Sequence, residues 1–130
     1  MIAVAPAMAT PASARAVVER YYIAIEAHRY RAAYVAWDRA GAASGLTYPA
    51  FARGFARTRH VRVVADTPRD GEGAAGSVFV TVPVTVTATL IDGTAQRFTG
   101  VYVLRRVNDV PGASAAQRQW HLASARLRRG

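Results

Sequence analysis

The clearest hydrophobic pattern in the chain is a strict alternation between Val78 and Leu90. Valine, then alanine and leucine, fill every second position, and threonine fills most of the positions between them. Because successive side chains of a strand point to opposite faces, this alternation predicts a long strand with one apolar and one threonine-rich face. A second β-branched run follows Asp92-Gly93, a dipeptide typical of tight hairpin turns. Residues 77–107 are therefore predicted to form a β-hairpin.

Two features of the first strand affect its shape. Pro83 lies inside the run and has no N–H to donate, so a bulge or a sheet edge is expected there. A strand of about fourteen residues would extend ~45 Å, which is long for a flat strand. The hairpin is therefore expected to belong to a strongly curved sheet.

A helical pattern precedes the hairpin. The first helix is predicted over about residues 13–27, with Ser13 as its N-cap. Its apolar stripe recurs at helical spacing and consists of Val17, Val18, Tyr21, Tyr22 and Ile25.

Two shorter helices are expected next. One is predicted over residues 30–39, with Trp37 among its inward side chains, and it follows a break at His28. The other begins at Thr47 with Pro49 in its first turn, and it places Phe51 and Phe55 on its buried side. Gly54 is expected inside that helix, where it would allow a close approach to another element.

Two further strands complete the predicted secondary structure. Residues 60–67 are predicted as a first strand and residues 117–127 as the last, with Trp120 and Leu122 on one face and His121, Ala123 and Ala125 on the other. Helices followed by an antiparallel meander predict an α+β fold of three N-terminal helices packed on about four to five strands. Residues 14–130 are expected to form one domain.

Residues 1–13 are small, apolar and interrupted by proline, without a basic start or a full apolar core. They are expected to be either a flexible tail or the remnant of an export signal, with a slight preference for export to the periplasm. No run approaches the ~20 apolar residues of a membrane span.

Charge changes this outline only modestly. The formal net charge is +9, and all seventeen basic residues are arginine. They are scattered, with the densest groups at residues 53–62 and 126–129, so a solvated basic surface is expected and nucleic acid is not favoured as a partner. The chain has no cysteine, which excludes disulfides, thiolate metal sites and a cysteine nucleophile.

The titratable residues suggest little catalysis. Most carboxylates fall in loops or off the apolar stripe, and only Asp38 and Asp66 could border a pocket. Asp38 is the one weak catalytic candidate, and its alternative role is to end the second helix or to pair with an arginine. The three histidines are too widely separated for a metal site, and no metal or cofactor is expected.

The aromatic residues are expected to converge between the helices and the sheet. They either fill the core or line a pocket suited to an apolar or aromatic small molecule. The candidate ligand-binding residues are Tyr21, Tyr22, Tyr34, Trp37, Phe55, Tyr102 and Trp120.

Several segments together resemble the nuclear transport factor 2-like superfamily. Residues 16–25 and 30–37 resemble its first two helices, residues 48–55 its third helix, and residues 78–90, 97–106 and 119–122 its curved sheet. The resemblance implies a cystatin-like cone with a pocket between helices and sheet, and often a dimer, here through the outer sheet face. It does not imply one function, because the superfamily includes isomerases, dehydratases, cyclases and non-enzymatic domains.

The sequence therefore favours a bacterial, non-catalytic domain that binds a small ligand or assists a partner. Two alternatives stay open. One is a small isomerase, dehydratase or cyclase acting in the same pocket, and the other is an arginine-rich surface that binds anionic polymers.

Overall fold

The chain folds as an α+β protein, as predicted. The computed structural model describes residues 10–70, 76–107 and 112–130. The helical elements are α1 (Pro11–Glu26), α2 (Tyr30–Tyr34), the 3₁₀ turn η2 (Ala42–Ser44) and α3 (Tyr48–Arg53). The strands are β1 (Thr58–Ala65), β2 (Arg69–Asp70), β3 (Ser77–Leu90), β4 (Ala95–Val107) and β5 (His121–Arg129).

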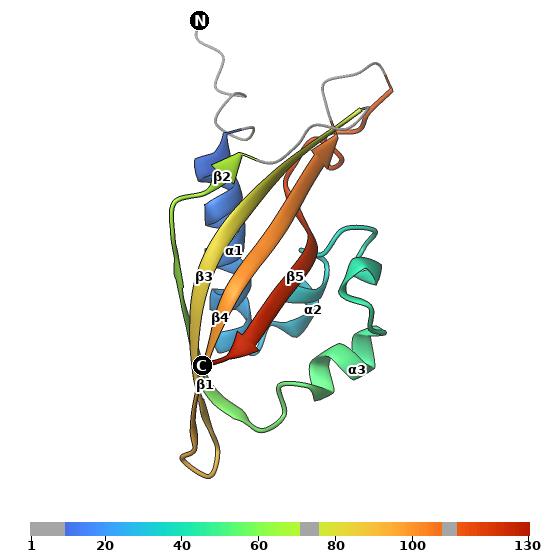
Figure 1. The fold of residues 1–130 in the computed structure, drawn as a ribbon. Helices are drawn as coiled ribbons and strands as arrows, with labels where there is room; N and C mark the ends of the chain where they lie inside the picture. Colours follow the sequence, from blue (N-terminus) through green and yellow to red (C-terminus); the bar gives the residue numbers. More distant parts are fainter. Residues whose placement is uncertain (1–9, 71–75, 108–111) are drawn as a thin grey trace, which may run out of the picture.

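The strands form an open antiparallel sheet in the order β1-β3-β4-β5, and the two-residue β2 pairs with β3 beyond the end of β1. Figure 1 shows β3 and β4 as a long bent ribbon, with the helices on one side of it. The predicted hairpin is confirmed. Gly93 adopts a left-handed φ of 87°, and the Asp92 carboxylate accepts a hydrogen bond from the Thr94 amide at 2.9 Å.

The alternation of β3 assigns its two faces as the sequence predicts. Val80, Val82, Val84 and Val86 are each at most 5% exposed, because they face the helices. We call this the inner face of the sheet. Phe79, the threonines and Pro83 lie on the opposite side, which we call the outer face.

Pro83 is accommodated without a bulge. The β3–β4 register runs unbroken from Ser77 to Thr89, and Pro83 pairs with Val101. On its other side the pairing with β1 ends at Val84, and the pairing with β2 begins at Thr81. Pro83 therefore lies just past the end of β1, where its carbonyl oxygen accepts a hydrogen bond from the Asp66 amide at 2.8 Å and its missing N–H interrupts no bond of the β1 ladder.

Helix α1 begins earlier than predicted. Its N-cap is Thr10, whose side chain accepts a hydrogen bond from the Ser13 amide, and Pro11 occupies the first turn. Ser13 is thus inside the helix and is not its cap. The predicted tail, residues 1–13, therefore includes the first turn of the domain, and its residues 1–9 lie outside the described part of the chain.

The second predicted helix is too long. Helix α2 ends at Tyr34, and Trp37 instead forms an isolated bridge with Leu122 of β5. Arg39, Ala40 and Gly41 all adopt positive φ angles, which are incompatible with a right-handed helix. The chain therefore leaves the helix to reach the edge of the sheet, an interaction that local periodicity does not report.

The third helix starts at the predicted Thr47 cap but ends at Arg53. Gly54 is its C-cap rather than an interior residue, and Phe55 lies in the following turn. Strand β1 also begins two residues earlier than predicted, because Thr58 already pairs with Leu90 at the end of β3.

Among the strands, β5 differs most from its prediction. It begins at His121 rather than Gln117, and it extends to Arg129. A bulge leaves Ala123 without a partner, since Leu122 pairs with Leu104 and Ser124 pairs with Val103. The extra residue reverses the alternation, so Ala125 and Leu127 face inward although His121 faces outward.

Glycine is required where β4 and β5 approach. A Cβ on Gly100 would lie 1.8 Å from the Arg126 carbonyl oxygen, so any larger residue would displace the strand backbone.

The core lies between the inner face of the sheet and the helices. Its fully buried side chains include Val18 from α1, Val82 from β3, Leu104 from β4 and Leu122 from β5.

Candidate functional site

One pocket opens on the inner face, at the end of the sheet where α3 leads into β1. Its volume is about 370 Å³, and we call it the tyrosine pocket. The side chains that line it come from α1, the turn after α3, and four strands. They are Tyr21, Tyr22, Phe55, Thr58, Val61, Val86, Ala88, Gln96, Phe98, Tyr102 and Leu127, together with the backbone of Gly54.

Three tyrosine rings form one wall of this pocket. Tyr21 and Tyr22 are consecutive on α1, and Tyr102 faces them from β4; each is at most 6% exposed. The rings meet edge to face, with centroids 5.1 Å apart for Tyr21–Tyr22 and 6.1 Å apart for Tyr22–Tyr102. Such contacts fix the ring orientations and add to the stabilisation from burial.

The hydroxyls of the same tyrosines are paired. The Tyr22 and Tyr102 oxygens lie 2.5 Å apart, and the Trp37 indole N–H donates to the Tyr21 oxygen at 3.2 Å. Each hydroxyl has one hydrogen, and the Tyr22–Tyr102 contact uses only one of two. No described residue is recorded as an acceptor for the other hydrogen.

Burial keeps these hydroxyls protonated. Desolvation raises the pKa of Tyr22 to about 12, although its hydrogen bond with Tyr102 acts in the opposite direction. Desolvation also raises the pKa values of Tyr21 and Tyr102, and neighbouring tyrosines reinforce the increase at Tyr102. At neutral pH the three groups are therefore hydrogen-bond donors and not bases.

The mouth of the pocket is made by more exposed residues. Gly54 is exposed, and Leu127 is 37% exposed. Phe98 lies next to the opening, and the Arg129 guanidinium carbon is 5.9 Å from the Phe98 ring centre. The pocket is thus lined by buried tyrosines on one side, and its lining residues become more exposed to solvent toward β5.

The structure places four of the seven candidate aromatics, Tyr21, Tyr22, Phe55 and Tyr102, in the pocket wall. The other three lie elsewhere. The Trp37 indole N–H donates to the Tyr21 hydroxyl, and the Tyr34 hydroxyl donates to the Leu46 carbonyl at 2.7 Å. The Trp120 indole donates to the Thr10 carbonyl and the Ser13 hydroxyl, which attaches the N-terminus of α1 to the start of β5. Ligand contact by any of the seven stays a prediction.

Sequence reasoning missed Phe98 and Leu127. Phe98 has the same parity as Tyr102 on β4, so the strand alternation alone could have placed it on the inner face. Leu127 could not be placed in this way, because its orientation depends on the bulge at Ala123.

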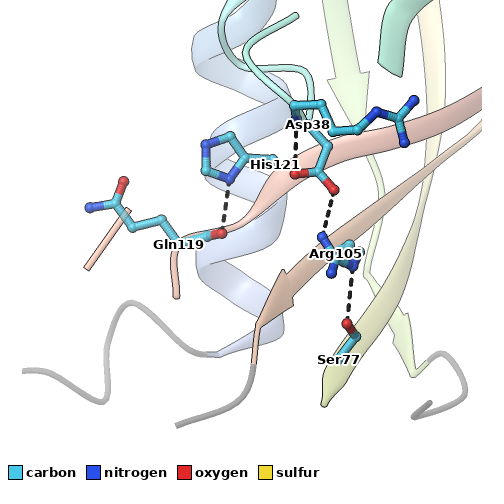
Figure 2. Close-up of polar contacts among 6 residues, drawn as sticks. Asp38, Ser77, Arg105, Gln119 and His121 are labelled. Atoms are coloured by element: carbon cyan, nitrogen blue, oxygen red, sulfur yellow. Dashed lines mark hydrogen bonds and ion pairs between the residues drawn. The ribbon is translucent and has the colours of Figure 1, made fainter. Parts of the chain in front are cut away.

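Asp38 lies in a different hollow, near the opposite end of β5. Figure 2 shows its carboxylate against Arg105, and the Arg105 guanidinium donates to it at 2.8 Å and to the Ser77 hydroxyl at 3.0 Å. The surrounding pocket has a volume of about 310 Å³ and includes His121. Asp38 therefore has the arginine partner that was its alternative role, and it does not line the tyrosine pocket.

A third hollow, of about 600 Å³, follows α1 and the free edge of β1. Its rim is open, since Ile23 is 66% and Val64 is 72% exposed. Glu26 is already engaged there, because its carboxylate accepts from the Val61 amide at 2.8 Å and contacts the His60 ring nitrogen at 3.0 Å. This groove offers apolar surface but no enclosed set of polar groups.

Within residues 10–70, 76–107 and 112–130, no three histidine, cysteine or carboxylate side chains gather in a way that would hold a metal. Over the same ranges, no helix has the length and apolar character needed to cross a bilayer. Comparisons with protein-family models, with curated proteins and with solved structures found no match to this chain.

Proposed function

We propose that the tyrosine pocket binds a small molecule with an aromatic or apolar body and one hydrogen-bond acceptor. The observation that supports this is the pocket itself: about 370 Å³ of space against three buried tyrosines, of whose three hydroxyl hydrogens the Tyr22–Tyr102 contact uses one. Ligand sites of this size are mostly apolar, with a few polar groups that fix the orientation of the ligand. Edge-to-face tyrosines offer an aromatic ligand the same contacts that they make with one another.

The lining favours binding over acid–base catalysis. None of the side chains that line the tyrosine pocket is a carboxylate or an imidazole. An isomerase or dehydratase needs a base within hydrogen-bond reach of the substrate, and the tyrosines are held in their neutral form. Asp38, the remaining candidate base, is paired with Arg105 in another hollow.

The cone architecture belongs to the same proposal. The order of helical segments followed by a bent antiparallel sheet supports a nuclear transport factor 2-like arrangement, with the tyrosine pocket at the opening of the cone. Because such folds host many activities, the proposed function depends on the pocket and not on the fold.

The test is a pocket-filling substitution. N-phenyl-1-naphthylamine, a neutral fluorescent aromatic, is expected to bind the wild-type protein with blue-shifted emission. Ala88 lines the pocket, so Ala88→Leu adds volume to it and should weaken binding at least about tenfold, or by roughly 1.4 kcal/mol. Thr89→Leu is the control, because it places the same leucine side chain on the outer face of the same strand.

A circular dichroism melt would establish that both variants are folded. Equal probe affinity in Ala88→Leu and Thr89→Leu would refute the pocket as the binding site.

The outer face supports a second candidate function, binding of an anionic polymer. Strand register brings Arg62, Arg97, Arg126 and Arg128 onto this face, although they are scattered in sequence. Arginine contacts to phosphates release counterions, so binding of a DNA duplex would fall steeply with salt. Absence of duplex binding at about 50 mM salt, the low end of the range over which such binding falls, would remove this candidate.

A homodimer through the outer face is also a proposal. Val64, Val101 and Val103 give this face apolar area, but two copies would bring the same arginines together. We therefore expect any such dimer to be favoured by high salt, because salt screens like charges. Sedimentation at two salt concentrations would test this expectation.

A further inference from the structure

A cationic side chain, that of Arg129, lies beside Phe98, one of the residues that line the tyrosine pocket. Arg129 pairs with Phe98 in the β4–β5 register, so both side chains are on the inner face. The Arg129 guanidinium carbon lies 5.9 Å from the centre of the Phe98 ring, and Phe98 lines the pocket. The bulge at Ala123 is the cause, because without it Arg129 would face the opposite side of the sheet.

This cation has no carboxylate partner in the described part of the chain. The three ion pairs found there are Arg15–Glu19, His60–Glu26 and Asp38–Arg105. The carbonyl oxygen of Gly130, the residue after Arg129, accepts a hydrogen bond from the guanidinium of another arginine, Arg97, at 3.4 Å. A guanidinium at the edge of an aromatic pocket, without an internal counter-charge, is a suitable partner for an anionic group on a ligand.

The neighbouring surface has the same sign. Arg53 and Arg57 are exposed on either side of Gly54 and Phe55, which line the pocket. The nearby acidic residue is Asp92 in the hairpin turn, and its carboxylate already accepts from Thr94. Both arginine-dense segments of the sequence therefore contribute residues to the lining of the tyrosine pocket.

We propose that the ligand of the tyrosine pocket is an aromatic carboxylate, whose ring lies against the tyrosines and whose carboxylate faces Arg129. This inference rests on the proposed binding function and specifies the class of ligand. A planar guanidinium binds a carboxylate through two parallel N–H donors, which would orient the ligand as well as attract it. The tyrosine hydroxyl hydrogen then remains for an acceptor deeper in the pocket.

The test compares two probes of the same shape, naphthalene-2-carboxylate and the neutral naphthalene-2-carboxamide, by isothermal titration calorimetry at low salt. Wild-type protein should bind the carboxylate about five-fold more tightly than the carboxamide, as expected for a partly exposed ion pair. Arg129→Gln should remove most of this preference while leaving carboxamide affinity unchanged, and Arg129→Lys should restore part of it.

The matched control is Arg128→Gln. It removes the same charge one residue away, but Arg128 pairs with Thr99 and lies on the outer face. The carboxylate preference should therefore persist in this variant. Equal losses in the Arg128 and Arg129 variants would indicate a general charge effect and would overturn the inference.

Other outcomes separate this inference from the proposed function. Equal binding of the two probes to wild-type protein would overturn the carboxylate assignment and leave the binding function intact. A preference that survives Arg129→Gln but is lost in Tyr102→Phe would place the carboxylate at the hydroxyl pair and would also overturn it. Failure of both probes to bind would refute the binding function and this inference with it.

Discussion

The two faces of the β3–β4 ribbon have the same backbone but opposite chemistry. On the inner face, valines of β3 and Leu104 of β4 are buried against the helices. On the outer face, threonines alternate with them, and arginines from three strands surround them. Strand alternation in β3 and β4 produces this contrast, and the bulge at Ala123 brings Arg126 and Arg128 of β5 onto the basic outer face.

A second contrast lies within the inner face. Around Leu104 and Leu122, which are 0% exposed, the side chains of the helices and the sheet are closely packed. Around Tyr102 and Phe98, only a few residues further along β4, the same layers separate and leave the tyrosine pocket. The closed end provides stability, and the open end contains the tyrosine pocket, for which we propose a ligand.

The largest difference in stability is expected between alanine substitutions at two consecutive residues of β4 that lie on opposite faces of the sheet. Leu104→Ala removes a fully buried side chain and should reduce the free energy of unfolding by about 3 kcal/mol. Val103→Ala, on the outer face, should cost less than about 1 kcal/mol. Urea denaturation measures both values, and similar costs would mean that the two faces are not distinct.

The tyrosine pair tests the open end of the inner face. Tyr22→Phe removes one hydroxyl but keeps the ring, so it should lower the free energy of unfolding by about 1 kcal/mol. The Tyr22→Phe/Tyr102→Phe double variant should cost less than the sum of the two single variants, because the hydroxyls interact with each other.

The contribution of this tyrosine pair to stability is expected to depend on pH. The Tyr22 pKa is raised by burial from 10.0 to about 12, so its protonated form is favoured in the folded state. Its contribution to stability is therefore complete below pH 10 and is lost as the pH rises from 10 to about 12. Absorbance titration should show an ionisation near pH 12 that is missing in Tyr22→Phe; its persistence in that variant would contradict the assignment.

A smaller effect is expected at the edge of the sheet, where both faces end. Glu26 joins α1 to β1 through the Val61 amide and His60, and these hydrogen bonds lower the Glu26 pKa. Glu26→Gln should cost about 0.5–1 kcal/mol at pH 7. Because the folded-state pKa is lowered, this contribution is present above the unfolded pKa and is lost as the pH falls through the folded value.

Glu19→Gln is the control for this prediction. Glu19 forms an exposed ion pair with Arg15 at 3.6 Å, which is worth less than about 0.5 kcal/mol. If chemical denaturation at pH 7 found equal costs for the Glu19 and Glu26 variants, the contact between α1 and the edge strand would be unimportant.

The sequence predicts what depends on local periodicity. The hairpin, its two faces and the Thr47 cap follow from alternation, turn chemistry and capping, and the structure confirms them. The errors occur where tertiary contacts override local preference. Trp37 leaves a helical pattern to bridge Leu122, and the bulge at Ala123 reverses the faces of β5.

The pocket was predictable to the same extent. Tyr21 and Tyr22 are in the wall because the helical stripe places them inward, and Tyr102 because its strand alternates. Trp120 shares that apolar pattern but lies under the N-terminus of α1, and the sequence cannot reveal how far along the sheet each aromatic lies. The face on which Arg129 lies could not be predicted for a different reason: it depends on the bulge at Ala123, the one β5 residue between His121 and Arg129 without a β4 partner.

The most direct test of the central claim is an NMR measurement of intermolecular nuclear Overhauser effects with bound naphthalene-2-carboxamide. We predict contacts from the naphthalene protons to the rings of Tyr22, Tyr102 and Phe98, which line the tyrosine pocket. Contacts confined to the hollow beside Asp38 or to the groove along β1, or no contacts at all, would contradict the account.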